Sequence, residues 1–127
     1  MAPRDLVERT RLFALAVLKF CRSVPPDSPD EVRQLRRAAN SVRSNYRAAR
    51  RGRSRAEFQA KLGIVFEEAD ECVDSLEYFR DARIKHDAAL IQEARELASI
   101  FATALKTTRA NTERMKELPG QHRSGKG

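Results

Sequence analysis

Residues 28–58 of this 127-residue chain read SPDEVRQLRRAANSVRSNYRAARRGRSRAEF and contain the clearest helix boundaries in the sequence. This stretch opens with Ser28-Pro-Asp-Glu31 and closes with Ser54-Arg-Ala-Glu57-Phe58, so the Ser-x-x-Glu pattern of a helical capping box occurs twice. Pro29 stands at the first helical position, where its missing N–H leaves no hydrogen bond unmade. The stretch predicts one helix that ends near Gly52 and another that begins after Ser54.

Two more helices are predicted on either side. The first runs from about Asp5 to Ser23 and stops before Pro25-Pro26, and the last starts around Asp87 and thins into polar residues before Pro119-Gly120. Each predicted helix carries apolar residues three or four positions apart. These stripes are Leu6, Thr10, Phe13, Val17 and Phe20; Leu35, Ala38, Val42, Tyr46 and Ala49; Phe58, Leu62, Val65, Ala69, Cys72, Leu76 and Phe79; and Leu90, Ala94, Leu97, Phe101, Leu105 and Thr108.

Four amphipathic helices joined by short connections must bury their stripes against one another. The sequence therefore predicts an all-α protein, an antiparallel up-down-up-down four-helix bundle over residues 1–118, with a flexible tail at 119–127. An extended pair of helical hairpins is the alternative, but the stripes are broader than a coiled-coil seam.

Composition excludes several classes of protein. No run of apolar residues is long enough to span a membrane, and the N-terminus lacks the apolar region of a signal peptide. Cys21 and Cys72 lie at the edges of the apolar stripes, so we expect free thiols in a reducing, cytoplasmic compartment. His86 and His122 stand apart from any nucleophile or metal-ligand spacing, so no catalytic residue, metal or cofactor is expected.

Charge is segregated along the chain. Residues 1–55 hold 14 basic and 5 acidic side chains, whereas residues 56–118 hold 9 basic and 13 acidic ones. On the second predicted helix, arginines fill an arc of about 140° opposite the apolar stripe and extend over roughly 27 Å. This set is Arg33, Arg36, Arg37, Arg43, Arg47, Arg50 and Arg51, and Arg53 and Arg55 continue it into the turn.

The third predicted helix has an acidic face opposite its stripe, with almost no compensating basic residues. Its members are Glu67, Asp70, Glu71, Asp74, Glu77 and Asp81. Both charged faces are consistent with simple solvation, but like charges three or four positions apart on a helix repel one another. Two further interpretations are that the arginines bind nucleic-acid phosphates, or that the arginine face of one subunit meets Glu67, Glu71 and Asp74 of another.

The first predicted helix favours association, because Leu12, Leu15 and Leu18 fall outside its core stripe and would face water in a monomer. Burial against another helix of the same bundle is the alternative. Ser41 and Asn45 lie beside the apolar stripe of the second helix, next to Tyr46. We expect them to form hydrogen bonds to a neighbouring helix and to serve a structural role.

Residues 34–58, together with Lys61-Leu62-Gly-Ile64 and Glu67-Glu68-Ala69-Asp-Glu71, resemble the four-helix-bundle family named for the 23S rRNA intervening-sequence protein. That family also contains the accessory variability determinant of diversity-generating retroelements. The resemblance covers roughly Leu6 to Leu105. It implies a homopentameric ring with a basic surface and, for the retroelement members, binding to nucleic acid and to a reverse transcriptase.

Together, residues and resemblance predict a non-enzymatic bundle that forms a ring and binds RNA or DNA by its backbone through the arginine face. Two alternatives stay open: a scaffold that docks a reverse transcriptase, and a purely structural ring in which the arginines pair with acids of a neighbouring subunit.

Overall fold

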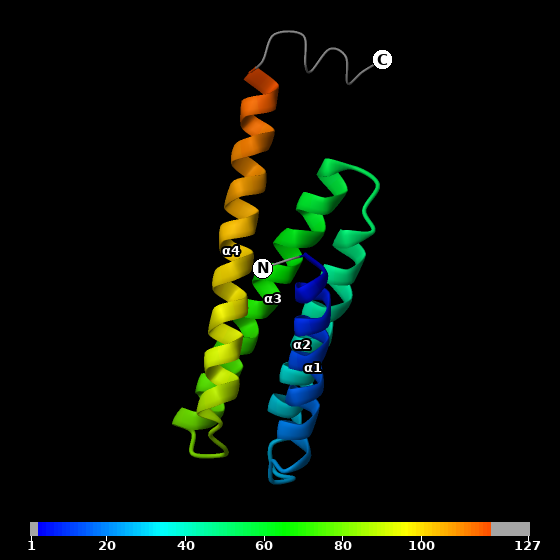
Figure 1. Cartoon of the computed structure of the whole chain (residues 1–127). Coiled ribbons are helices and arrows are strands. Elements are labelled where there is room, and N and C mark those ends of the chain that lie inside the picture. Colours follow the sequence, from blue (N-terminus) through cyan, green and yellow to red (C-terminus); the bar gives the residue numbers. More distant parts are fainter. Residues whose placement is uncertain (1–2, 118–127) are drawn as a thin grey trace.

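The computed structural model describes residues 3–117 and contains four helices in that range: α1 Pro3–Arg22, α2 Pro29–Arg50, α3 Arg55–Asp81 and α4 Ala88–Glu117. They alternate in direction along the bundle, and α4 extends beyond the end of the other helices (Figure 1). The predicted four-helix, all-α fold is confirmed. The predicted tail lies outside the described residues.

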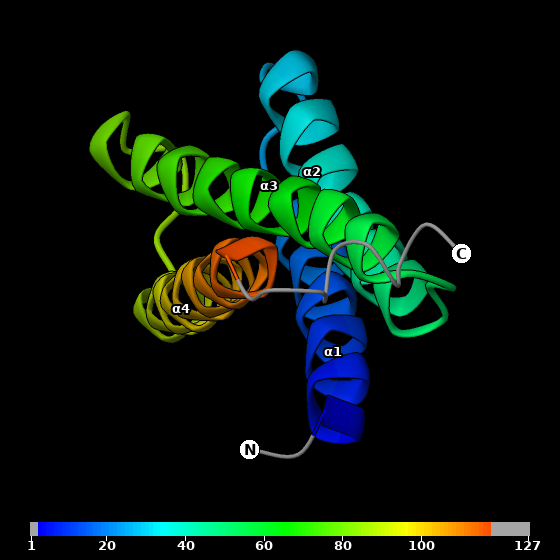
Figure 2. The ribbon, with the colours of Figure 1, turned by 90° about the horizontal axis from the view of Figure 1, so that it is seen from above.

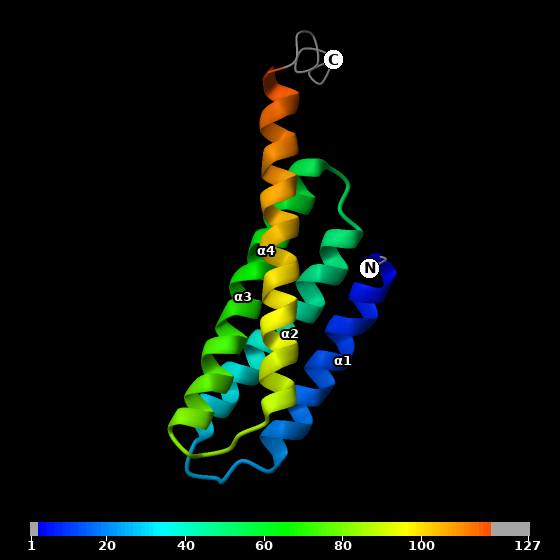
Figure 3. The same cartoon turned by 60° about the vertical axis from the view of Figure 1, so that its left-hand side comes forward.

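Successive helices pack side by side, α2 with α3 most extensively, whereas α1 and α4 share the smallest contact. Seen along the bundle, α1 and α4 diverge from each other (Figure 2), and a third view shows the projecting end of α4 clearly (Figure 3). Two aromatic pairs fill the centre across the diagonals: Phe20 with Phe79, and Tyr46 with Phe101, whose ring centroids lie 5.5 Å and 5.2 Å apart.

The predicted stripes form the core. All five stripe residues of α2 are buried, as are all of those on α3 except Phe58 and all of those on α4 except Thr108, and these two are half-buried. On α1 only Leu6 is half-buried. Thr10 is fully buried because its hydroxyl donates to the carbonyl oxygens of Leu6 and Val7 at 2.9 and 3.0 Å, so the polar atom is satisfied within the helix.

Of the two predicted capping boxes, the one at Ser54 forms with its return bond one residue early, and the one at Ser28 lacks its side-chain cap. Ser54 has an extended backbone and its hydroxyl accepts from the Glu57 N–H at 3.0 Å, while the Glu57 carboxylate accepts from the Arg53 N–H at 2.6 Å. Ser28 precedes α2 as predicted, with Pro29 as its first residue, but makes no side-chain cap bond. Its ψ of 51° departs from the extended conformation that such a cap requires, so this part of the prediction is wrong.

The connection between α3 and α4 contains an arginine in the left-handed conformation that glycine usually adopts. Arg83 has φ 60°, and the N–H groups of Ile84 and Arg83 donate to the carbonyls of Phe79 and Arg80. This is a Schellman arrangement with arginine at the left-handed position. The next residue but one, Lys85, donates to the Phe20 carbonyl at 2.9 Å and lies 4.5 Å from the centre of its ring, so the loop is tied to the end of α1.

No helix within the described range is both long and apolar enough to cross a membrane.

Candidate nucleic-acid interface

The arginine face of α2 is present as predicted. Its apolar stripe is buried in the bundle, so the rigid helix holds the opposite side toward solvent. Arg43 is half-buried, and the remaining members of the predicted set are exposed: Arg33, Arg36, Arg37, Arg47, Arg50, Arg51, Arg53 and Arg55.

The arginines in the first half of this face mostly have polar partners. Arg33 pairs with Asp30 one turn earlier at 2.7 Å, and Arg43 donates to the Asn40 side chain at 2.7 Å. Arg37 reaches α3, where it contacts Glu68 at 3.3 Å and Glu71 at 2.6 Å. Glu68 and then Glu71 raise the pKa of Arg37, so its charge is permanent and partly neutralised.

The arginines in the second half of this face, and in the turn after it, lack such acidic partners. Between residues 3 and 117, no carboxylate lies within ion-pair distance of the arginines at 47, 50, 51, 53 and 55. The turn after α2 passes through Gly52, where a Cβ would lie 3.1 Å from the Ala49 carbonyl oxygen, a tighter contact than most side chains make. These guanidinium groups are free to bind an external anion.

A groove of about 700 Å³ runs between α1 and α2 and joins the arginine face of α2 to the outward leucines of α1. Arginines line its walls, and Ala14, Leu15 and Leu18 of α1 contribute apolar surface. The α2 side consists of Arg33, Arg36, Arg37, Asn40 and Arg43, and Arg11 completes the α1 side. We call this the basic groove. Leu12 and Leu15 are exposed and Leu18 is half-buried, which confirms that they face away from the core of the single chain.

Arg11 and Asn40 also line the groove, although the sequence does not single them out. Arg11 sits one position before Leu12, on the same outward side of its helix, and that adjacency is the one signal the sequence offers.

The acidic face of α3 is only partly as expected. Glu67 and Asp74 are exposed and make no ion pair within the described chain, but Glu71 binds Arg37 of its own chain. Glu77 likewise binds Arg95 of α4. Arg80 of α3 itself pairs with Asp81 at 2.9 Å. Three of the six acids are therefore compensated, by arginines of α2, α3 and α4, which corrects the expectation that this face has almost no compensating basic residues.

The Ser41 and Asn45 side chains do not reach another helix. The Asn45 amide donates to the Ser41 carbonyl at 3.0 Å and to the Ser41 hydroxyl at 2.9 Å, one turn away on α2 itself. Four-residue spacing favours this local bond over one across helices, so the predicted partner is wrong. Tyr46 is buried, and burial raises the pKa of its hydroxyl.

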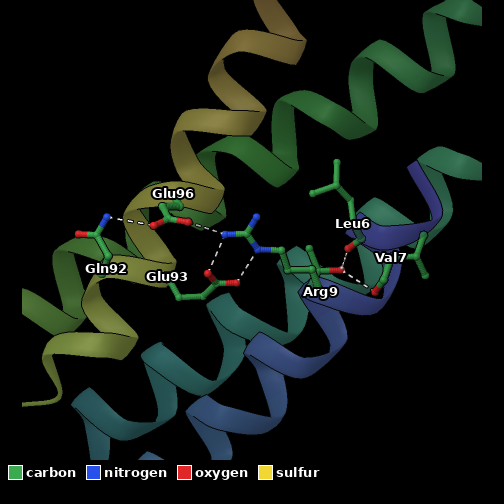
Figure 4. A network of polar contacts seen from close by, with 7 residues as sticks. Leu6, Val7, Arg9, Gln92, Glu93 and Glu96 are labelled. Carbon is green, nitrogen blue, oxygen red and sulfur yellow. Dashed lines mark hydrogen bonds and ion pairs between the residues drawn. The ribbon is translucent and has the colours of Figure 1, made fainter. Parts of the chain in front are cut away.

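A polar cluster that was not predicted from the sequence joins α1 to α4 (Figure 4). Arg9 donates to both carboxylate oxygens of Glu93 at 2.7 Å and to Glu96 at 2.8 Å, and Gln92 donates to Glu96 at 3.1 Å. The spacing of Glu93 and Glu96 puts both carboxylates on one side of α4, which is the only sequence signal for the cluster.

The two cysteines are free and buried. Burial, with the nearby carboxylates of Glu68 and Glu71, raises the pKa of Cys72 far above its usual range, so the thiol stays protonated and poorly nucleophilic. Burial also raises the pKa of Cys21. His86 lies exposed before α4, and His122 is outside the described residues. Within residues 3–117, no three histidine, cysteine or acidic side chains are grouped to hold a metal ion.

Comparison with known proteins places the chain in a family. A solved structure of a protein of unknown function from the S23 ribosomal protein family of Bacteroides thetaiotaomicron has the same fold, with a TM-score of 0.75 and 21% identity, over 84% of this chain and 99% of the other. No curated protein matches. The family model of the 23S rRNA-intervening sequence protein matches residues 4–103. The chain belongs to the 23S rRNA-intervening sequence protein family.

Proposed function

We propose that this protein is a non-enzymatic nucleic-acid-binding bundle that holds a phosphate backbone with the arginines of α2. The observation that carries the proposal is the row of exposed guanidinium groups along one side of α2 and the turn after it, six of which have no acidic partner in the described chain. Guanidinium groups form paired hydrogen bonds with phosphate oxygens, and every basic residue of α2 is an arginine.

Backbone contact, not base reading, is the expected mode of recognition. Tyr46, the one aromatic residue of α2, is buried against Phe101 and cannot stack on a base. Phosphate contacts position a nucleic acid without reading its sequence. We therefore expect the protein to bind RNA or DNA with little sequence preference.

Salt dependence tests this proposal. Fluorescence anisotropy with a labelled RNA hairpin and a DNA duplex of equal length would give the dissociation constant at several salt concentrations. If four phosphates are contacted, affinity falls on the order of a hundredfold between about 50 and 200 mM salt. Affinity that does not change over this range would refute the phosphate model.

We propose, as a second function, that copies of this chain assemble head to tail. The four exposed large apolar residues of the described chain divide between two faces: Leu12 and Leu15 beside the basic groove, and Ile64 and Tyr78 on α3. Glu67 and Asp74 lie on the same outward side of α3 as Ile64 and Tyr78, three or four positions apart. The basic groove and this acidic face are therefore complementary in both charge and apolar content.

A contact between two different faces repeats from copy to copy and closes into a ring when the rotation permits. The family resemblance favours five subunits. Light-scattering mass tests the assembly: the wild-type protein should form a closed oligomer, and Leu15→Glu should give a monomer that retains its helical content. An oligomer that survives both Leu15→Glu and Glu67→Lys/Asp74→Lys would exclude this interface.

Docking of a reverse transcriptase, the role implied by the retroelement branch of the resemblance, would use the same basic groove if the enzyme offers an acidic helix. A reverse transcriptase gene and template repeat beside this gene would favour that role, and a position inside an rRNA gene would oppose it.

A further inference from the structure

Two segments of the chain carry all of its net charge. Residues 47–61 and 106–117 together contain ten basic and three acidic side chains, a balance of +7. The whole chain is also +7, so the other 100 residues contain fifteen of each sign. Charge that is confined in this way indicates a local anion-binding surface better than a generally basic protein does.

The fold brings these two segments to the same end of the bundle. The turn between α2 and α3 and the projecting part of α4 both lie at the end where α3 begins (Figures 1 and 3). Contact is direct, because the Thr112 hydroxyl of α4 lies 3.0 Å from the side-chain oxygen of Gln59 on α3. This contact places α4 at residue 112 beside the start of α3, next to the turn that precedes α3.

The basic residues at this end are also the least neutralised. Of the ten, only Lys116 has an ion pair in the described chain, a contact of 3.5 Å with Glu113. The Glu57 carboxylate is occupied by a backbone N–H of the turn. In the basic groove, by contrast, Arg11, Arg33 and Arg37 each pair with a carboxylate.

We propose that nucleic acid binds chiefly across this end of the bundle, where the turn forms one phosphate contact and Lys106 and Arg109 of α4 form a second. The inference rests on the proposed function and relocates its site: the basic groove is secondary, and α4 contributes residues that the arginine face of α2 does not include. Lys106 and Arg109, three positions apart and exposed, present their charges on one side of α4.

Three matched double substitutions test the location, since each removes two positive charges from exposed positions. They are Arg51→Gln/Arg53→Gln in the turn, Lys106→Gln/Arg109→Gln on α4, and Arg33→Gln/Arg36→Gln in the groove. Arg22→Gln/Arg83→Gln at the opposite end serves as the control for total charge. Circular dichroism would verify that each variant keeps its helices.

We expect the turn and α4 variants each to bind the RNA hairpin at least about tenfold more weakly than the control, with the salt slope reduced by about 1.8. The groove variant should lose less than either. An α4 variant that binds like the control, or a groove variant that loses the most, would overturn this inference and leave the proposed function standing. Salt-independent binding by the wild-type protein would instead refute the proposed function itself.

Discussion

Two arginines each hold a pair of glutamates across a helix–helix seam, yet the two clusters are built in opposite ways. Arg9 joins α1 to Glu93 and Glu96 on α4, and Arg37 joins α2 to Glu68 and Glu71 on α3. In each, the two glutamates are three residues apart. The Arg9 side chain is 21% exposed and its nearer glutamate 32%, whereas Arg37 is 55% exposed and Glu68 only 19%.

This difference in exposure predicts which cluster loses more stability when its arginine is removed. One oxygen of Glu68 is buried with no hydrogen-bond partner among residues 3–117, so this carboxylate depends on Arg37 for its neutralisation. Glu93 and Glu96 remain accessible to water if Arg9 is removed. We therefore expect Arg37 to contribute more to stability than Arg9, although Arg37 is the more exposed of the two.

Core packing should contribute more to the free energy of unfolding than either arginine cluster. Phe101→Ala removes the ring that packs on Tyr46 and is fully buried, so we expect a loss of about 3–5 kcal/mol in the free energy of unfolding. Thr103→Ala, exposed two residues further along α4, should change it by less than about 0.5 kcal/mol. Urea denaturation measures both. If Phe101→Ala lowers the free energy of unfolding no more than either arginine variant does, ion pairs between helices and not core packing would dominate the stability of the bundle.

Removal of Arg37 comes next. Arg37→Met keeps the aliphatic stem but leaves a largely buried carboxylate with no cation, and we expect a loss of about 1–3 kcal/mol. Glu68→Gln in the same background should recover most of this loss because it removes the unpaired charge. If the double variant is as unstable as Arg37→Met, the cost comes from lost packing and the comparison fails.

Arg9→Met should have a smaller effect, about 0.5–1 kcal/mol, since water can replace the guanidinium at both glutamates. The local effect should be larger than the global one, because α1 and α4 share little other contact. Hydrogen exchange should therefore speed up in the first turns of α1 while α2 and α3 remain protected. Unchanged exchange in α1 would show that the apolar stripe alone positions this helix.

The sequence predicts these helices well and their connections poorly, for a physical reason. Burial of a stripe such as Leu62, Val65 and Ala69 depends on spacing within one helix, which the sequence displays directly. The Arg9 cluster joins residues 84 positions apart in the chain, so no local sequence pattern predicts it. The basic groove is similar, because Leu15 and Arg36 become neighbours only when α1 packs on α2.

Local rules also failed where backbone geometry overrides composition. Ser28 has the right residue type and spacing for a cap, but its ψ of 51° is not the extended value of such a cap and its side chain forms no cap hydrogen bond. Arg83 takes a left-handed conformation that usually selects glycine, and its neighbour Ile84 is half-buried against the core. The contact of Ile84 with the core depends on how α3 and α4 pack, which a single sequence does not show.

The smallest expected effect is the pH dependence of the Arg9 cluster. A hydrogen bond from Gln92, and then the one from Arg9, lowers the pKa of Glu96 below its ordinary value of 4.5. A carboxylate with a lowered pKa in the folded state stabilises the fold above the unfolded value, and this contribution is lost as the pH falls through the folded pKa. The difference in unfolding free energy between wild type and Arg9→Met should therefore shrink as the pH falls below about 4.5.

Lys19→Met provides the matched control on the same helix, because Lys19 is exposed and has no ion pair among residues 3–117. Its difference from wild type should vary much less with pH. Urea denaturation of the three proteins at several pH values would separate the two possible contributions of Arg9. A difference between wild type and Arg9→Met that stays constant in acid would assign the contribution of Arg9 to packing of its aliphatic stem, and the two clusters would then differ in kind as well as in burial.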